Sequence, residues 1–261
     1  MPRLAHAASV GLVPLLLHCE DQARVASRAP EVPLEEPEPV VAGEEGEDPA
    51  EASLGAPPKA GSAGSALLAE VDRELAQMKR STYAHHTHVD ESQGTYEYDC
   101  SGFLGYVLAR SVPDAWSALV ATTPRRPRSV EIVNFLLRIP VGGTSGRWQH
   151  LARIEDLAPG DVVVWRKPAD SLSTNTGHTV VVYGPVVADA LRPGAFLVPV
   201  ADSTEHLHVP GDSRSAAQRT GLGQGEIVLV GDASGAPVAY RWSRGTKSRE
   251  KSTTIALGRL R

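Results

Sequence analysis

The sequence has little cysteine, little aromatic content and no excess of positive charge. Its two cysteines, Cys19 and Cys100, allow one bridge at most and exclude a disulfide framework. Aromatic residues make up 5% of the 261 residues, but 41% are hydrophobic, so part of the chain can bury a sizeable core. The net charge of -5 argues against nucleic acid as the main partner, because phosphate binding requires a basic surface.

Residues 1–19 have the layout of a signal peptide. One arginine, Arg3, precedes a mostly apolar run from Leu4 to Leu17, which is too short to span a bilayer as a stable anchor. Cys19 follows at the place where bacterial lipoprotein signals carry the cysteine that is lipidated, although His18 stands where such signals have a small residue. We therefore expect an exported protein of the cell envelope, with Cys19 as a candidate lipid anchor to the membrane. An uncleaved, disordered N-terminus is the alternative.

Residues 20–62 differ sharply in composition from the rest of the chain. The segment APEVPLEEPEPVVAGEEGEDPAEASLGAPPKAG is made mostly of Pro, Glu, Ala and Gly, with almost no large apolar side chain. It cannot bury enough surface to offset its ordering entropy, and its prolines and self-repelling carboxylates favour an extended chain. We therefore expect a disordered acidic tether between a membrane anchor and a working domain at residues 63–261.

The hydrophobic pattern of residues 63–261 changes from helical to strand-like. Apolar residues at helical spacing predict a helix over about 65–79 and another that starts near Cys100, and the segments PDAWSALVAT and RSVEIVNFLLRI predict two more. The segment YAHHTHVDESQGT, between the first two helices, is predicted to be a loop. From about Gly160 the short runs DVVVWR, HTVVVYG, AFLVPVADS, EIVLVGD, PVAYRWS and TIALGRL predict six strands. Helices followed by antiparallel strands indicate an α+β domain, with N-terminal helices packed on a mostly antiparallel sheet or half-barrel.

Cys100 stands at the edge of an apolar segment, in the polar turn Asp-Cys-Ser-Gly. Asp99 or Ser101 is expected to cap the helix that starts there, which places the thiol near the positive end of the helix dipole. Cysteine is a nucleophile as the thiolate, and a helix N-terminus or a nearby imidazolium favours that form. The position therefore predicts a nucleophile. An ordinary buried cysteine is the alternative.

A thiolate catalyst needs a base within hydrogen-bond reach and a group that orients the base. His178 opens the apolar strand HTVVVYG after a polar loop, so its ring is expected near a cleft. The orienting group should come from the neighbouring strand, where Asp202 ends an apolar run. The next two residues, which both carry hydroxyl groups, are expected to hold Asp202 by hydrogen bonds. Glu205 and His206 are the alternatives to Asp202.

Three segments together resemble the NlpC-type cell-wall endopeptidases, which are papain-like cysteine peptidases. They are YDCSGF, GDVVVW and GHTVVVY. In that family the cysteine of the first segment starts a helix, the second segment forms a strand, and the histidine of the third heads the next strand. The resemblance covers roughly residues 80–205. It implies a papain-like fold in which Cys100 is the nucleophile, His178 the base and Asp202 the third member.

The resemblance also bears on the substrate and on the residues that bind it. In that family the tyrosine two positions before the cysteine, here Tyr98, lines the substrate site. Gly102 leaves room for a substrate or another backbone to approach, and Ser101 beside it is a further candidate substrate-binding residue. The predicted reaction is cleavage of an amide bond through a thioester acyl-enzyme. The expected substrate is a peptide-stem bond of peptidoglycan, and no cofactor is implied.

Other functions fit the same residues. The family that the segments resemble also includes amidases and acyltransferases that act on other envelope substrates. A catalytically weak envelope-binding module would keep the fold and would tolerate loss of Cys100. A cytoplasmic amidase would require that the N-terminal segment is not an export signal, and the acidic tether argues against that reading.

Several other segments have a simpler interpretation. The tract from His85 to His88 is dense in histidine, but no cysteine or carboxylate cluster completes a metal site except Asp90 and Glu91, so a solvated loop is favoured over zinc binding. The basic segment TPRRPRS is either a solvated loop or a contact for an anionic polymer. GLGQGE, from Gly221, precedes a strand and therefore does not form a dinucleotide-binding loop.

Overall fold

The computed structural model describes residues 58–123, 125–172, 174–217 and 219–261. The predicted signal peptide, the candidate lipidation site Cys19 and residues 20–57 of the predicted tether lie outside the described residues. Within the described part of the chain, no helix has both the length and the apolar character needed to cross a bilayer.

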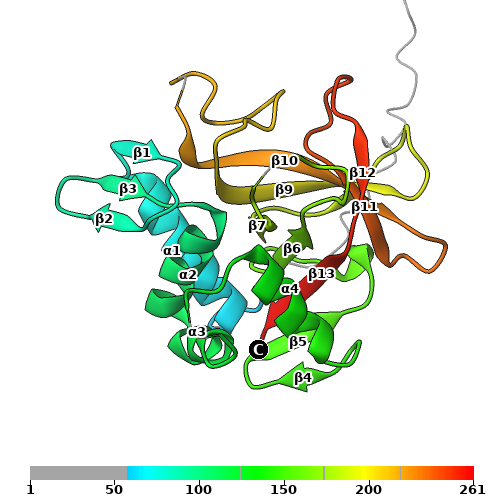
Figure 1. Ribbon diagram of the computed structural model, residues 1–261, viewed down its shortest axis with the longest axis horizontal. Coiled ribbons are helices and arrows are strands. Elements are labelled where there is room, and N and C mark those ends of the chain that lie inside the picture. The colour runs from blue at the N-terminus through cyan, green and yellow to red at the C-terminus, as the bar shows by residue number, and fades with distance from the viewer. Residues whose placement is uncertain (1–57, 124, 173, 218) are drawn as a thin grey trace, which may run out of the picture. The chain divides into compact units, whose positions relative to one another are not determined.

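The α-helices of the described residues occur where the sequence pattern predicts them. They are α1 (Ala63–Gln77), α2 (Cys100–Ser111), α3 (Pro113–Val120) and α4 (Ser129–Arg138). Local signals set where helices begin: the Ser62 hydroxyl accepts a hydrogen bond from the Ser65 amide before α1, and Pro113 is the first residue of α3. In Figure 1, α1, α2 and α3 group together on the left of the view, beside the large sheet.

Part of the segment predicted to be a loop between α1 and α2 belongs to a small sheet, so the prediction was wrong for that part. Strand β1 (Arg80–Thr82) pairs in parallel with β3 (Thr95–Glu97), and β2 (His88–Asp90) pairs with β3 in the antiparallel direction. Each strand has three residues. That length is too short to show the alternation of apolar and polar residues by which strands are recognised in a sequence.

The large sheet is antiparallel, with the order β12-β11-β10-β9-β7-β6-β13-β5-β4 and with β8 beside β9. The predicted strands are β6 (Val162–Arg166), β7 (Gly177–Val182), β9 (Ala195–Thr204), β10 (Gly221–Gly231), β11 (Pro237–Arg241) and β13 (Ile255–Leu260). The sequence analysis missed β4 (Thr144–Ser145), β5 (Trp148–Leu151), β8 (Val187–Ala188), β12 (Glu250–Ser252) and a 3-10 helix at Ile154–Asp156. The strands from Gly221 onward complete the sheet, because β10 extends it beyond β9 and β13 joins β6 to β5.

The large sheet is curved, so that strands far apart in its order face each other. The ring centroids of Trp165 on β6 and Tyr240 on β11 lie 4.6 Å apart, although β10, β9 and β7 separate these strands. Alternate residues of each strand point to opposite faces and therefore enter two cores. Val162 and Val164 pack toward the helices, whereas Val163 and Trp165 fill the other side.

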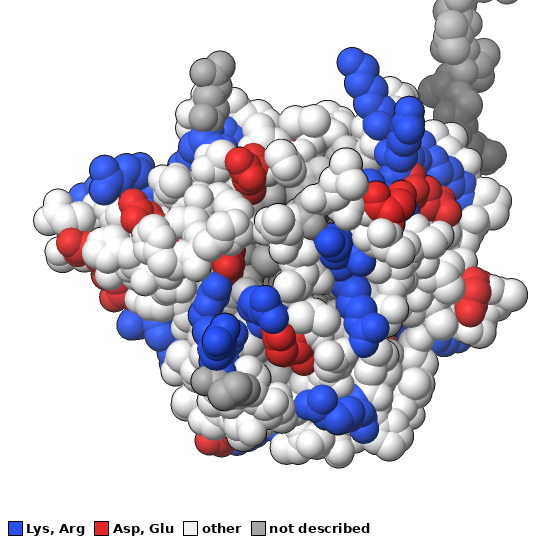
Figure 2. Space-filling view, viewed as in Figure 1, with Lys and Arg blue, Asp and Glu red and all other residues white. Residues whose placement is uncertain are grey.

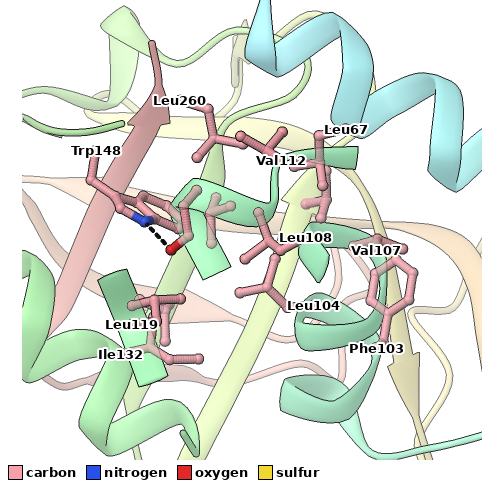
Figure 3. Packing of buried hydrophobic residues seen from close by; sticks show 14 of the residues in the cluster. Leu67, Phe103, Leu104, Val107, Leu108, Val112, Leu119, Ile132, Trp148 and Leu260 are labelled. Atoms are coloured by element: carbon pink, nitrogen blue, oxygen red, sulfur yellow. Dashed lines mark hydrogen bonds between the residues drawn. The ribbon is translucent and has the colours of Figure 1, made fainter. Parts of the chain in front are cut away.

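The core between the helices and the sheet is apolar (Figure 3). Leu104 and Leu108 of α2 belong to it, together with Trp148 of β5. The indole Nε1 of Trp148 donates a 3.0 Å hydrogen bond to the carbonyl oxygen of Ala115, which satisfies the polar atom of a fully buried ring. The predicted α+β class, with helices packed on a largely antiparallel sheet, is therefore confirmed.

Glu74 of α1 places a carboxyl group inside the protein interior. Its Oε2 accepts a 2.7 Å hydrogen bond from the Tyr98 hydroxyl, and its Oε1 has no partner among the described residues. Burial raises the pKa of Glu74 to about 8, although the hydrogen bond from Tyr98 lowers it in part. This pKa lies above that of an exposed glutamate. The contribution of Glu74 to stability is therefore greatest at low pH and is lost as the pH rises through about 8.

We expect Glu74→Gln to remove this pH dependence. Glutamine keeps an acceptor for Tyr98 and cannot ionise. The free energy of unfolding of the variant relative to the native chain should therefore rise by about 2–4 kcal/mol between pH 5 and pH 9. Urea unfolding of the full chain at both pH values measures this change, with Glu250→Gln at an exposed position as the matched control. Parallel pH profiles for the native chain and the variant would contradict a proton-bearing buried carboxyl.

Candidate active site

Cys100 is the first residue of α2, as the sequence predicts. The Asp99 carboxylate caps the helix by accepting a 2.7 Å hydrogen bond from the amide of Gly102. The thiol is free and 5% exposed, and it lines a cleft of about 310 Å3. Its sulfur lies 3.6 Å from the hydroxyl of Ser129, the first residue of α4. The N-terminal ends of two helices therefore meet near this sulfur.

Arg126 occupies the space that Gly102 leaves on α2. Its guanidinium donates two 2.7 Å hydrogen bonds to the carboxylate of Asp99. Burial opposes the ionisation of Asp99, but this ion pair outweighs burial and lowers the pKa of the carboxyl. A Cβ at Gly102 would stand 2.5 Å from Nη1 of Arg126. The glycine therefore makes room for a side chain of the protein itself, where the sequence predicted the approach of a substrate or of another backbone. Ser101 is buried beside the cleft, and its hydroxyl donates a 3.0 Å hydrogen bond to Asp99.

His178 lies at the start of β7, next to a glycine that the backbone requires. Gly177 has a φ of +149°, and a Cβ there would stand 1.9 Å from the Trp165 carbonyl oxygen. Nε2 of His178 lies 2.6 Å from Oδ2 of Asp202, and Cys100 is a second hydrogen-bond partner of this side chain. Burial opposes a charge on the ring, but attraction to Cys100 and the hydrogen bond with Asp202 raise the pKa of His178 to about 9.

Asp202 is fully buried on β9, which is the neighbour of β7 in the sheet. Besides His178, its Oδ2 contacts Nε2 of His208 at 3.0 Å, and its Oδ1 accepts a 2.9 Å hydrogen bond from Nη1 of Arg214. Burial disfavours the charged carboxyl. The nearby His208 and Arg214, together with the hydrogen bond from His178, nevertheless hold the pKa of Asp202 well below its usual range.

The hydroxyl groups of Ser203 and of the threonine after it do not hold Asp202, contrary to the expectation from the sequence. Ser203 donates a 2.6 Å hydrogen bond to the carbonyl oxygen of Tyr98 instead. Successive residues of a strand point to opposite faces, which turns Ser203 away from the side of Asp202. Glu205 and His206, the alternatives to Asp202, are exposed at the rim of a neighbouring cavity.

A buried ion pair fixes the cation beside Asp202. Arg214 is fully buried and donates hydrogen bonds from Nε at 2.8 Å and from Nη2 at 2.7 Å to the two carboxylate oxygens of Asp212. Asp212 also accepts a 2.7 Å hydrogen bond from the backbone amide of His208. Both side chains come from the segment between β9 and β10, and the sequence analysis did not identify either of them.

Glycines of β10 make room for these two side chains. Gly223 and Gly225 are two residues apart, so they lie on the same face of the strand. A Cβ at Gly223 would stand 2.7 Å from the Arg214 side chain, and one at Gly225 would stand 2.7 Å from that of His208. Gly223 pairs directly with Asp202 across the two strands. GLGQGE forms the first part of β10, whereas the sequence analysis predicted that it precedes the strand. Its alternating glycines are the sequence signal that could have located the network.

Aromatic rings pack against His178. Its ring centroid lies 5.2 Å from that of Trp165 and 4.8 Å from that of Trp242. Both rings, together with Tyr240, line a second cavity of about 460 Å3 that shares residues with the first cleft. Aromatic rings at these distances favour a positive charge on the imidazole.

Tyr83 lines both cavities, whereas Tyr98 does not reach them. Tyr98, the tyrosine expected to bind substrate, is fully buried, and its hydroxyl donates to Glu74 in the interior. Burial, together with the negative charge of Asp99, raises the pKa of Tyr83, so its hydroxyl keeps a proton that it can donate to a ligand. Tyr83 lies in the segment that was interpreted as a loop, and no motif in the sequence identifies it.

Cationic side chains border both cavities. Figure 2 shows Lys and Arg side chains on both sides of a hollow near the centre of this face. Arg126 and Arg128, from the basic segment TPRRPRS, line the cleft of Cys100, and Lys167 and Lys251 line the adjoining cavity. The basic segment therefore forms part of the wall of the cleft.

Among the described residues, three potential metal ligands lie together. Nε2 of His178, Oδ2 of Asp202 and Nε2 of His208 are all within 4.8 Å of one another, whereas the tract at residues 85–88 is exposed and is not part of such a group. The separations of 2.6 and 3.0 Å are hydrogen-bond lengths, shorter than the roughly 3.3 Å expected between ligands of a tetrahedral zinc ion. The other carboxylate oxygen of Asp202, Oδ1, already accepts a hydrogen bond from the guanidinium of Arg214. The distances between these atoms therefore match hydrogen bonds better than the coordination of a metal ion.

Comparison with known proteins adds nothing to this geometry. A search of protein-family models, curated proteins and solved structures found no match for the chain. The assignment of a function therefore depends on the residues and on their arrangement.

The close approach at Gly223 gives a test of the network. We expect Gly223→Ala to displace the Arg214 side chain from Asp202 and to lower the free energy of unfolding by about 1–3 kcal/mol. Gly64→Ala is the matched control, because a Cβ there meets its nearest atom at 3.7 Å. Thermal and urea unfolding of the full chain measure both changes. Equal stability of the two variants would contradict the close packing of Arg214 on β10.

Proposed function

We propose that the protein is a cysteine hydrolase that cleaves an amide bond through a thioester acyl-enzyme. One observation carries the proposal. Cys100 starts a helix in a cleft, and His178 is held at 2.6 Å from the buried carboxylate of Asp202, where its interactions with Cys100 and Asp202 raise the pKa of the ring to about 9. An imidazole that stays protonated at neutral pH next to a thiol is the arrangement that produces a reactive thiolate.

In the proposed reaction the Cys100 thiolate attacks the carbonyl carbon of the bound amide and forms a carbon–sulfur bond. The developing oxyanion would be stabilised by backbone N–H groups at the start of α2, which have no acceptor within the helix. His178 then gives its proton to the amide nitrogen as the carbon–nitrogen bond breaks, and the amine leaves. His178 then takes a proton from a water molecule as the water attacks the thioester, and the carbon–sulfur bond breaks to release the carboxylic acid and restore the thiolate beside the imidazolium.

Asp202 and Ser129 have supporting roles in this proposal. Asp202 accepts a hydrogen bond from Nε2 of His178, which fixes the orientation of the ring. The Ser129 hydroxyl is 3.6 Å from the sulfur and 3.1 Å from the hydroxyl of Thr179, the residue after His178. Ser129 would therefore hold the sulfur in place between α2 and β7.

The substrate we propose is a peptide-stem bond of peptidoglycan. The resemblance to NlpC-type endopeptidases at YDCSGF, GDVVVW and GHTVVVY supports this choice. The cationic wall of the cleft supports it as well, because the peptide stems carry carboxylates that Arg128 and its neighbours would attract. The predicted export signal would deliver the enzyme to the cell envelope, where this polymer is found.

We expect the full chain to cleave purified peptidoglycan stem peptides and to form a covalent acyl adduct at Cys100. Cys100→Ala should abolish both, and His178→Ala should slow cleavage by roughly 10²–10⁴-fold. Liquid chromatography with mass spectrometry follows the products and the adduct. His86→Ala changes an exposed histidine outside both cavities and is the matched control.

Three outcomes would point to the alternatives. Intact substrate with no adduct, together with binding that Cys100→Ala leaves unchanged, would indicate an envelope-binding module. An adduct that is released by an added amine but not by water would indicate an acyltransferase. Cleavage of other amides but not of stem peptides would keep the mechanism and replace the proposed substrate.

A further inference from the structure

His208 contacts Asp202 in a way that the proposed reaction does not require. The ring is fully buried, with its centroid 4.5 Å from that of Trp242 on one side and Gly225 of β10 on the other. Its backbone amide is held by Asp212 at 2.7 Å. The side chain therefore has one fixed position, and both ring nitrogens are in contact with oxygen atoms.

The two acceptors determine how many protons the ring carries. Nδ1 lies 2.7 Å from the carbonyl oxygen of Trp242, which can only accept, so Nδ1 must carry a proton. Nε2 lies 3.0 Å from Oδ2 of Asp202, and this carboxylate already accepts hydrogen bonds from Arg214 and His178. A neutral ring would direct the lone pair of Nε2 at a negatively charged oxygen. The contact is attractive only when Nε2 carries a proton as well.

The charges of the surrounding groups agree with this proton count. Asp202 and Asp212 contribute two buried negative charges, and Arg214 contributes one positive charge. A second cation is needed to neutralise the group, because an unbalanced buried charge is expensive. His178 does not supply it in the proposed resting state, since its charge is balanced by the Cys100 thiolate.

We propose that His208 is a permanently protonated positioning residue, an imidazolium that neutralises Asp202 and limits how strongly Asp202 holds the proton of His178. The inference builds on the proposed function for the role of His178. The protonation of His208 can be measured without any substrate. A neutral His208 would therefore overturn this inference without overturning the proposed hydrolase function, and the reverse also holds.

The charge of His208 would act on His178 across a short distance. The two ring centroids are 6.5 Å apart, and both rings contact the same oxygen of Asp202. Asp202 favours the charged form of His178, and the cation at His208 opposes it. His178 must accept and release a proton in each proposed turnover, so a partner that weakens the pull of Asp202 helps both steps.

Long-range ¹H–¹⁵N spectra of the full chain, labelled with ¹⁵N-histidine, test the proton count directly. We expect both ring nitrogens of His208 to show the shift of a protonated nitrogen at pH 8. His150 provides a reference in the same spectrum. It is buried, with Nδ1 2.9 Å from the Ile139 carbonyl oxygen, and it contacts no carboxylate among the described residues. A neutral His208 with one protonated nitrogen would overturn the proposal.

His208→Gln tests the effect on His178 in the same spectra. Removing the positive charge should raise the pH at which His178 titrates by about one to two units, from about 9 in the native chain. A purely structural role predicts the opposite, because a loosened Asp202 would lower that pH. An unchanged or lower value would overturn the proposal. Stoichiometric zinc binding that shifts the Nε2 signals of both histidines would also overturn it, since they would then be metal ligands.

Discussion

The buried carboxylate of Asp202 is the constraint on which the rest of the structure depends. A fully buried charge costs several kcal/mol unless opposite charges and hydrogen-bond donors surround it. His178, His208 and Arg214 do so here, and they come from β7 and from the segment between β9 and β10. Both parts of the chain must therefore be in place before the carboxylate is satisfied. The same contacts fix the ring that faces Cys100.

The thiol is positioned by a separate set of contacts on the other side of the cleft. The ion pair between Asp99 and Arg126 fixes the first turn of α2, and the hydroxyl of Ser129 meets the sulfur from α4. The sulfur and the imidazole are therefore held by two separate sets of contacts, one on each side of the cleft. The curvature of the sheet adds the third element, because it places Trp165 and the aromatic residues near β11 around the imidazole.

The parts of the site that the sequence predicts are those with a local signal. Cys100 in its capping turn and His178 at the head of an apolar run are each identified by a few neighbouring residues. Asp202 was predicted from the expectation that the strand it ends lies beside the strand of His178. His208 and Arg214 come from an irregular segment whose position depends on tertiary packing, and no periodicity marks it. The sequence pointed to Tyr98 as the tyrosine of the cleft for a similar reason, because only the packing of the small sheet shows that Tyr83 lines it.

The pH dependence of the alkylation of Cys100 by iodoacetamide tests the central claim most directly. The full chain and His178→Ala would be compared, with mass spectrometry of the peptide that contains Cys100 as the readout. A thiolate–imidazolium pair predicts fast alkylation well below pH 7 in the native chain and its loss in the variant. An unactivated thiol has a pKa of about 8.5. Slow alkylation in both proteins that becomes faster only near this pH would contradict the account.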